Sequence, residues 1–245
     1  MSHKINILEG AFIVSDAHYS HKRPELLEFL KDIHSKKLRP SQLILMGDIF
    51  DALFGGVSYT QKTNLEAIKL LNEISLEIEV VYLEGNHDFN LKSIFPNIKL
   101  FSISQQPVTC RYVDKKILLA HGDMKSGIAY RIYTALIRNR VLLYLLSLLD
   151  FILVHYILKR LDKYLSQKDD CKKMRGFEAF ISKRLEDKYS CDYFIEGHFH
   201  QNSIIEFKDF IYINLGVFAC NQRYFIVKSF KERELLQENI FSKGI

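Results

Sequence analysis

Five short polar motifs recur along this chain, and each follows an apolar run rich in Val, Ile and Leu. Their carboxylate, imidazole and amide side chains mix hard oxygen with borderline nitrogen ligands, which suits Mn, Fe, Zn or Ni better than Ca or a thiolate-bound metal. Two ions can each receive about four protein ligands from such a set if one carboxylate bridges them, and Asp48 is the best candidate for the bridge. The motifs are, in chain order, Asp16-Ala17-His18, Gly47-Asp48-Ile49-Phe50-Asp51, Gly85-Asn86-His87-Asp88, His121-Gly122-Asp123 and Gly197-His198-Phe199-His200.

The elements that position these motifs alternate between strand and helix in the first half of the chain. Apolar runs at residues 12–14, 42–46 and 78–83 predict strands, and the hydrophobic spacing of residues 24–37 and 63–74 predicts helices. This alternation indicates a parallel α/β unit. Because ligands gather outside the carboxyl ends of parallel strands, we expect the five motifs to meet at one edge.

The second half of the predicted core consists of shorter strands. Residues 116–120 lead into His121, and residues 204–207, 210–215 and 223–230 read as further strands. We expect these C-terminal strands to build a second, mostly antiparallel sheet against the first. The core is then discontinuous, with residues 1–124 and 190–245 on either side of an insertion at 125–189.

Composition indicates a globular protein whose positive charge is concentrated in one segment. The chain has 245 residues, of which 48% are hydrophobic, and a net charge of +5. Residues 125–188 hold 14 basic and 7 acidic side chains, a net of +7, so the remainder carries −2. This favours an anionic partner at that segment. The four cysteines form no Cys-x-x-Cys pair and the N-terminus lacks a signal-peptide pattern, so we expect a reduced, cytoplasmic setting with Cys110 and Cys220 as small core residues.

The most unusual stretch is the 18-residue run 141–158, in which only Ser147, Asp150 and His155 are polar. By length alone it is a marginal transmembrane candidate. A single span, however, would put the first four motifs and the last one on opposite sides of a bilayer. On a helix the polar residues share one stripe and leave the other faces apolar. We therefore expect a helix or helical hairpin that lies in the membrane surface or holds acyl chains; burial against the core or in a dimer interface is the alternative. Residues 169–187 predict one more helix.

In this order the five motifs resemble those of the calcineurin-like metallophosphoesterase superfamily. The patterns are Asp-x-His, Gly-Asp-x-x-Asp, Gly-Asn-His-Asp, His-Gly-Asp and Gly-His-x-His, and Asn214-Leu215-Gly216 resembles the Asn-x-Gly that often follows them. The resemblance covers the core and leaves residues 128–189 outside the general pattern. It implies an α/β fold of the αββα type, with two mixed sheets flanked by helices and a helical lid insertion. It also implies two divalent metal ions, with Mn²⁺ expected and Fe, Zn or Ni as alternatives.

The resemblance further implies a role for each motif residue. His87 would stabilise or protonate a phosphoryl group without binding metal, and Asp51 and Asp88 would orient neighbouring histidines, although both could be ordinary turn or helix-cap carboxylates. Two ions about 3.5–4 Å apart can bridge a hydroxide, lower its pKa toward neutrality and clamp phosphoryl oxygens during in-line attack. The implied ligands are Asp16, His18, Asp48 and His200 for the first metal, and Asp48, Asn86, His121 and His198 for the second.

The insertion, apolar in one stretch and basic in others, resembles the lid of the UDP-2,3-diacylglucosamine hydrolases. Those enzymes cleave the pyrophosphate of a nucleotide-linked diacyl sugar in lipid A synthesis, giving 2,3-diacylglucosamine 1-phosphate (lipid X) and UMP. The resemblance implies a nucleotide-linked lipid substrate and a cytoplasmic enzyme held peripherally at the inner membrane, with no nucleic acid and no obligate protein partner. The candidate substrate-binding residues are Asn86, His87, Lys125, Tyr130, Arg131 and Arg138, with plain solvated surface as the alternative for the last four.

The third motif, Gly85-Asn86-His87-Asp88, departs from that of the UDP-2,3-diacylglucosamine hydrolases. The commonest form of that hydrolase has Arg where this chain has His87. The chain could represent a separate calcineurin-like lineage that performs the same step, or act on another membrane-derived phosphoester. A cytosolic phosphodiesterase, phosphoprotein phosphatase or nuclease would share the metal site without needing the apolar run, and a nuclease more often spreads basic and aromatic residues along a channel. A non-enzymatic scaffold would be expected to have lost ligands, and all seven are present.

Overall fold

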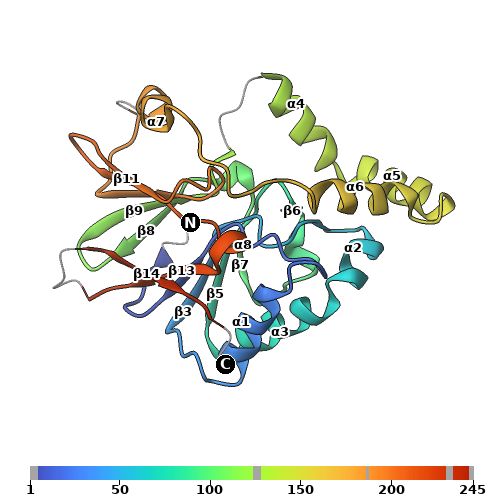
Figure 1. Ribbon diagram of the computed structural model, residues 1–245, viewed down its shortest axis with the longest axis horizontal. Coiled ribbons are helices and arrows are strands. Elements are labelled where there is room, and N and C mark those ends of the chain that lie inside the picture. Colours follow the sequence, from blue (N-terminus) through green and yellow to red (C-terminus); the bar gives the residue numbers. More distant parts are fainter. Residues whose placement is uncertain (1–4, 124–127, 186–187, 230–233, 243–245) are drawn as a thin grey trace.

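The computed structural model describes residues 5–123, 128–185, 188–229 and 234–242, which form two six-stranded sheets and one two-stranded sheet. The first large sheet has the order β14-β13-β2-β3-β5-β7, in which β2, β3, β5 and β7 run parallel (Figure 1). The predicted strands 12–14, 42–46 and 78–83 match β2, β3 and β5 to within one residue. The strands are β2 (Phe12–Val14), β3 (Gln42–Leu45), β5 (Glu79–Leu83), β7 (Lys99–Phe101), β13 (Arg223–Val227) and β14 (Leu236–Ile240).

The second large sheet is mixed, and the prediction of a mostly antiparallel sheet is wrong. Its order is β1-β8-β9-β10-β12-β11, with parallel pairs at β1–β8, β9–β10 and β10–β12. The long insertion between β9 and β10 is a crossover that brings the chain back in the same direction, which makes a parallel pair. The strands are β1 (Ile5–Asn6), β8 (Val108–Tyr112), β9 (Lys115–Ala120), β10 (Tyr193–Glu196), β11 (Ser203–Glu206) and β12 (Ile211–Asn214).

Strand β13 was also expected in the second sheet, but it lies in the first. It pairs antiparallel with β2, where Phe225 faces Ile13, and continues into β14. Strand pairing is a long-range contact that the alternation of apolar residues does not report, since alternation gives only the two faces of a strand.

The two sheets pack face to face between helices, which confirms the predicted αββα arrangement. Alternate residues of the first sheet face opposite ways: Leu45 packs with the helix residue Phe29, whereas Ile44 packs with Ile195 of the second sheet. On the far side, Ile181 of α7 packs on the second sheet. The flanking helices are α1 (Glu25–His34), α3 (Leu65–Glu77) and α7 (Phe177–Leu185); shorter elements are α2 (Ser58–Thr63), α8 (Phe218–Asn221), β4 (Leu53–Phe54), β6 (Asp88–Phe89), η1 (Leu91–Ser93) and η2 (Ile103–Gln105).

Helix α7 begins eight residues later than the predicted helix 169–187, so the N-terminal part of that prediction is wrong. Gly176 precedes α7 with φ +70°, a left-handed conformation that does not occur inside a right-handed helix. Residues 170–174 instead form hydrogen bonds with the core, so their backbone is not available for a helix. 

Helices α4 (Ile128–Ile137), α5 (Arg140–Ile152) and α6 (Tyr156–Leu165) project away from the two sheets (Figure 1). The predicted helix or hairpin over 141–158 is broken at residues 153–155, where Val154 and His155 have positive φ, and α5 and α6 meet at 103°. Among the described residues, no single helix has the length and apolar character to cross a membrane, although α5 and α6 together pass that test as a bent pair.

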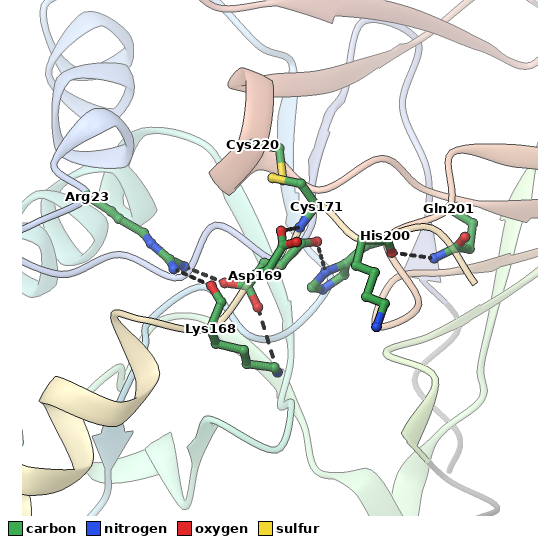
Figure 2. Close-up of a disulfide and its surroundings, with 9 residues drawn as sticks. Arg23, Lys168, Asp169, Cys171, His200, Gln201 and Cys220 are labelled. Atoms are coloured by element: carbon green, nitrogen blue, oxygen red, sulfur yellow. Dashed lines mark hydrogen bonds and ion pairs between the residues drawn. A yellow bond between two sulfur atoms is a disulfide. The ribbon is translucent and has the colours of Figure 1, made fainter. Parts of the chain in front are cut away.

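A disulfide between Cys171 and Cys220 joins the end of the insertion to α8 (Figure 2). The prediction that Cys220 is a small core residue is therefore wrong, and so is the expectation that all four cysteines are reduced. The two residues lie 49 positions apart with Cα atoms 5.8 Å from each other, a proximity that only the fold creates. Cys110 is free and buried, as expected. The cytoplasmic location stays a prediction.

Candidate metal centre

The five motifs converge because each lies in the loop that follows a strand. Asp16 follows β2, Asp48 follows β3 and Asn86 follows β5, all in the first sheet. His121 follows β9 and His198 follows β10 in the second sheet. The carboxyl ends of both sheets thus supply the centre, as expected for parallel strands.

The first cluster consists of Asp16, His18 and His200, whose candidate ligand atoms all lie within 4.8 Å of one another. His200 Nδ1 lies 2.6 Å from the carbonyl oxygen of Asp170, which can only accept, so Nδ1 carries the proton. In the neutral ring the lone pair of Nε2 then faces Asp16 Oδ1 at 3.0 Å. Nε2 of His18 is buried and has no hydrogen-bond partner among the described residues. Two acceptors that face each other beside an unpartnered ring nitrogen fit a bound cation.

The second cluster consists of Asp48, His121 and His198. His121 Nδ1 lies 2.9 Å from the carbonyl oxygen of Met46, so its Nε2 lone pair faces Asp48 Oδ2 at 3.4 Å. Asn86 Oδ1 also lies 3.3 Å from this Nε2. Three acceptor atoms therefore converge here, and the donor set again fits a cation.

The electrostatics keep the carboxylates and His198 in the forms that bind metal, whereas, despite burial, Asp48 and Asp16 raise the pKa of His121 and His200, so that metal binding there would release a proton. Burial alone would raise the pKa of Asp48, but the charges on His121 and His87 hold it well below its ordinary value. Burial also opposes ionisation of Asp16, yet the nearby His200 lowers the pKa of that carboxyl. Burial and the neighbouring His121 lower the pKa of His198 to about 3. Charged carboxylates and a neutral imidazole are the metal-binding states.

His87 lies beside both clusters. Its ring centroid is 5.0 Å from that of His18, and its Nδ1 lies 2.8 Å from the carbonyl oxygen of Asp51. This leaves Nε2 as its second ring nitrogen, 4.0 Å from Asp48 Oδ2. The Asp51 carboxylate lies 3.4 Å from His18 Nδ1, in the place expected for a group that orients this histidine.

Among the described residues the Asp88 carboxylate makes no hydrogen bond to a histidine, contrary to its predicted role. Its carboxylate accepts hydrogen bonds from the backbone N–H of Ile49 at 2.6 Å and Gly85 at 2.9 Å, and from Tyr82 Oη–H at 2.6 Å. Asp88 is the first residue of β6, and its hydrogen bonds show that its side chain points toward the loop that carries Asp48. Burial and the charge of Asp48 raise the pKa of Asp88 to about 7. Asp88 therefore stabilises the backbone of the loop that carries Asp48, the candidate bridging ligand.

A family model described as calcineurin-like phosphoesterase matches residues 11–202, a span that includes all five motifs. The chain belongs to this family. The match confirms the resemblance of the motifs, the fold class and the enzyme class, a metal-dependent phosphoester hydrolase.

Relatives of this phosphoesterase include the UDP-2,3-diacylglucosamine hydrolase of Haemophilus influenzae strain PittGG, which is 25% identical over 226 residues and aligns with 87% of this chain and 92% of its own. The enzyme of that name from Blochmanniella pennsylvanica strain BPEN is 26% identical over 199 residues, 78% of this chain and 79% of its own. Among solved structures, an archaeal phosphodiesterase overlaps with a TM-score of 0.46 and 16% identity, covering 94% of this chain and 99% of that one.

Two glycines of the phosphoesterase motifs are required by close approach. A Cβ built on Gly85 would collide with Asp48 Oδ1, and one built on Gly197 would collide with Ser15 Oγ and Asp16 Oδ2. These glycines let the loops of different strands come together around the carboxylates.

Of the four residues predicted to bind the head group beyond the metal motifs, the structure describes the side chain of Arg138. Lys125 lies outside the described residues, and so do the side chains of Tyr130 and Arg131. Arg138 is not plain solvated surface, because only 12% of its side chain is exposed. It donates from Nη2 to the Gly85 carbonyl at 2.7 Å, which places it against the loop that carries Asn86 and His87.

A cleft of about 370 Å³ extends from the metal centre into the insertion, a volume typical of small-molecule sites. Asp51, Asn86 and His87 line its polar end. Its walls are otherwise largely apolar and come from the β4–β6 region and from α4, α5 and α6. The apolar lining residues are Phe54, Val57, Phe89, Ile137, Leu143, Leu146, Ile157, Leu158, Leu161 and Leu165.

Helix α5 turns Ser147, Asp150 and Leu143 toward the cleft and exposes most of its other apolar residues. Asp150 is 2% exposed and lines the cleft with Ser147, whereas Tyr144 and Phe151 are 65% and 68% exposed. The alternative that this run is buried against the core is therefore wrong.

Residues that sequence reasoning missed lie behind the histidines of the first cluster. Arg23 and Asp170 form an ion pair at 2.5 Å, and Arg23 also lies 3.9 Å from Asp51. Neither residue follows a predicted strand or belongs to a motif, so the sequence carried no signal for them.

Proposed function

We propose that this phosphoesterase hydrolyses the pyrophosphate bond of UDP-2,3-diacylglucosamine to give 2,3-diacylglucosamine 1-phosphate (lipid X) and UMP. The observation that carries the proposal is the shared cleft, in which Asn86 and His87 line the same cavity as apolar side chains of α5 and α6. A substrate that joins a pyrophosphate to acyl chains needs both surfaces within one site. Relatives named for this activity, aligned over most of the chain, support it.

At the metal centre, some residues would bind the two ions and His87 would transfer a proton. Asp16, His18 and His200 would hold one ion, Asn86, His121 and His198 the other, and Asp48 both. When bound, two divalent ions, Mn²⁺ in this proposal, supply a water of lowered pKa and positive charge for the phosphoryl oxygens. His87 presents Nε2 beside Asp48 because Nδ1 is held by the Asp51 carbonyl, and from there it can give a proton to a phosphoryl or leaving-group oxygen.

Arg138 is the candidate for binding the anionic head group. Its guanidinium lies 3.7 Å from Asp123 and 5.4 Å from the centre of the Phe89 ring, which lines the cleft. Its Nε is buried and has no hydrogen-bond partner among the described residues. An N–H donor on a cation that packs over the cleft-lining Phe89 suits a phosphate oxygen.

The outward apolar face of α5 and α6 supports attachment to the surface of the inner membrane. Side chains such as Val141, Phe151 and Val154 are 68–72% exposed, and contiguous exposed apolar surface marks interaction sites. Exposed Arg140 and Lys159 flank this face, where they can approach lipid phosphates. Sedimentation with anionic phospholipid vesicles tests this, and protein that stays in the supernatant would contradict it.

The substrate is tested by measuring UMP release in Mn²⁺ from UDP-2,3-diacylglucosamine and from UDP-N-acetylglucosamine, which has the same pyrophosphate without the two long acyl chains. We expect kcat/KM to be at least about 100-fold higher for the acylated substrate, because burying even four methylenes stabilises a complex by about 3 kcal/mol. Leu161→Gln, in the cleft wall, should lower only the acylated rate, while Leu76→Gln, at a position 74% exposed, should change neither. Equal rates for both substrates, or no UMP while aryl phosphodiesters are split, would reject the substrate in favour of another phosphoester.

A further inference from the structure

The segment that leads from α6 toward α7, residues 166–174, lies against the first metal cluster and is here named the return segment. It contains no helix or strand and is described throughout. Core residues that contact it include Arg23 and Cys220, the latter through the disulfide (Figure 2). The side chain of Gln201 also accepts from the N–H of Met174 at 2.8 Å. The part of the insertion nearest the metal centre is thus tied to the core.

The return segment sets the protonated nitrogen of His200. The Asp170 carbonyl accepts from Nδ1 at 2.6 Å, which turns Nε2 toward Asp16. A partner of this kind fixes both the tautomer and the ring orientation of a metal-binding histidine.

Arg23 connects that contact to the other histidine of the first cluster. Its Nη1 donates to Asp170 Oδ2 at 2.5 Å and lies 3.9 Å from Asp51 Oδ1. Asp51 in turn lies 3.4 Å from His18 Nδ1. The side chains of Asp51 and Asp170 are 4% and 3% exposed, so one guanidinium serves two buried carboxylates. Removing it leaves Lys168, 3.7 Å from Asp170, as the remaining cation for two buried carboxylates, whose repulsion would move the groups behind His18 and His200.

We propose that Arg23 and Asp170 are positioning residues for the first metal site. Their ion pair holds the return segment where its carbonyl orients His200, and it holds Asp51 where its carboxylate orients His18. The second cluster depends on a different support, since His121 is oriented by the Met46 carbonyl. The proposal rests on the metal centre of the family and not on the identity of the substrate.

The test is a titration of the metal-free full chain with Mn²⁺, followed by electron paramagnetic resonance, which distinguishes single ions from an exchange-coupled pair. We expect the wild type to bind two ions and to develop the coupled signal. Arg23→Met should weaken the first site by about 10- to 100-fold, the range for losing an outer-shell partner, and leave the second within about twofold. Arg39→Met, an exposed arginine that donates to the Lys36 carbonyl, is the matched control and should behave as the wild type.

Two further variants keep the proposal open to refutation if Arg23→Met folds poorly. Arg23→Lys should recover part of the first-site affinity, because a point charge can pair with Asp170 but not span both carboxylates. Asp170→Asn keeps the backbone carbonyl and should weaken the first site less than Arg23→Met. Equal weakening of both sites, or unchanged affinity in Asp170→Asn and Arg23→Met, overturns the proposal. Because no substrate is present, this result is independent of UMP release.

Discussion

The metal centre and the insertion helices use similar hydrophobic sequence in opposite ways. Ile13, Ile44 and Val81, in the strands that lead to the metal motifs, are fully buried between the sheets. Val141 and Phe151, on α5, are 70% and 68% exposed. Hydrophobic composition therefore predicts burial only where the same chain supplies a cover. Where it does not, as on α5, the exposed face supports the proposed attachment to a membrane surface.

Replacing Asp48 at the metal centre should have the largest effect on activity. We expect Asp48→Ala to abolish measurable hydrolysis, because it removes the carboxylate shared by both proposed ions. The fold should persist, since Asp88 still holds the backbone of the Ile49 loop. Turnover and circular dichroism measured on the same preparation check both points, and retained activity would refute a bridging role.

The comparison itself is tested by replacing one buried aromatic residue of the core and two exposed aromatic residues of α5. Phe29→Ala, at a fully buried position of α1, should lower the free energy of unfolding by about 3–5 kcal/mol. Tyr144→Ser combined with Phe151→Ser should change it by no more than about 0.5 kcal/mol per site, yet reduce the vesicle-bound fraction. Denaturant unfolding and vesicle sedimentation give the two readings. A large loss of stability in the double variant would mean that α5 is covered in solution, for example in a dimer.

The smallest effect concerns the thiols and the covalent link between the two regions. In denaturant without reductant the chain should show two free thiols, and four after reduction, because Cys171 and Cys220 are bonded. In the native protein, burial raises the pKa of Cys110 to about 12 and of Cys191 to about 11. Both should therefore react slowly with iodoacetamide at pH 8, where the thiolate is scarce. Four thiols before reduction would show that the bridge is absent.

The sequence predicted the convergence of the metal motifs because that depends on a local rule. Asp16, Asp48 and Asn86 each follow an apolar run, and parallel strands end at a common edge. The alternation of strands and helices likewise located α1 and α3. Local patterns are sufficient to predict the site because the geometry of a parallel sheet brings the ends of its strands together.

What the sequence did not predict depends on contacts between distant segments. The pairing of β13 with β2, the bond between Cys171 and Cys220 and the Arg23–Asp170 ion pair each join residues more than 40 positions apart. The late start of α7 has the same origin, since residues before it are held by core groups. Neither periodicity nor motif spacing reports such partners.

The position of β13 bears on how the polypeptide can assemble during translation. Strand β2 needs β3 on one edge and β13 on the other, yet β13 is made only after every proposed metal ligand has been synthesised. Until residues 223–227 leave the ribosome, the Phe12–Val14 edge remains unpaired, and unpaired strand edges recruit other chains. The nascent protein therefore carries its complete set of ligands before it can close the sheet that supports the first of them.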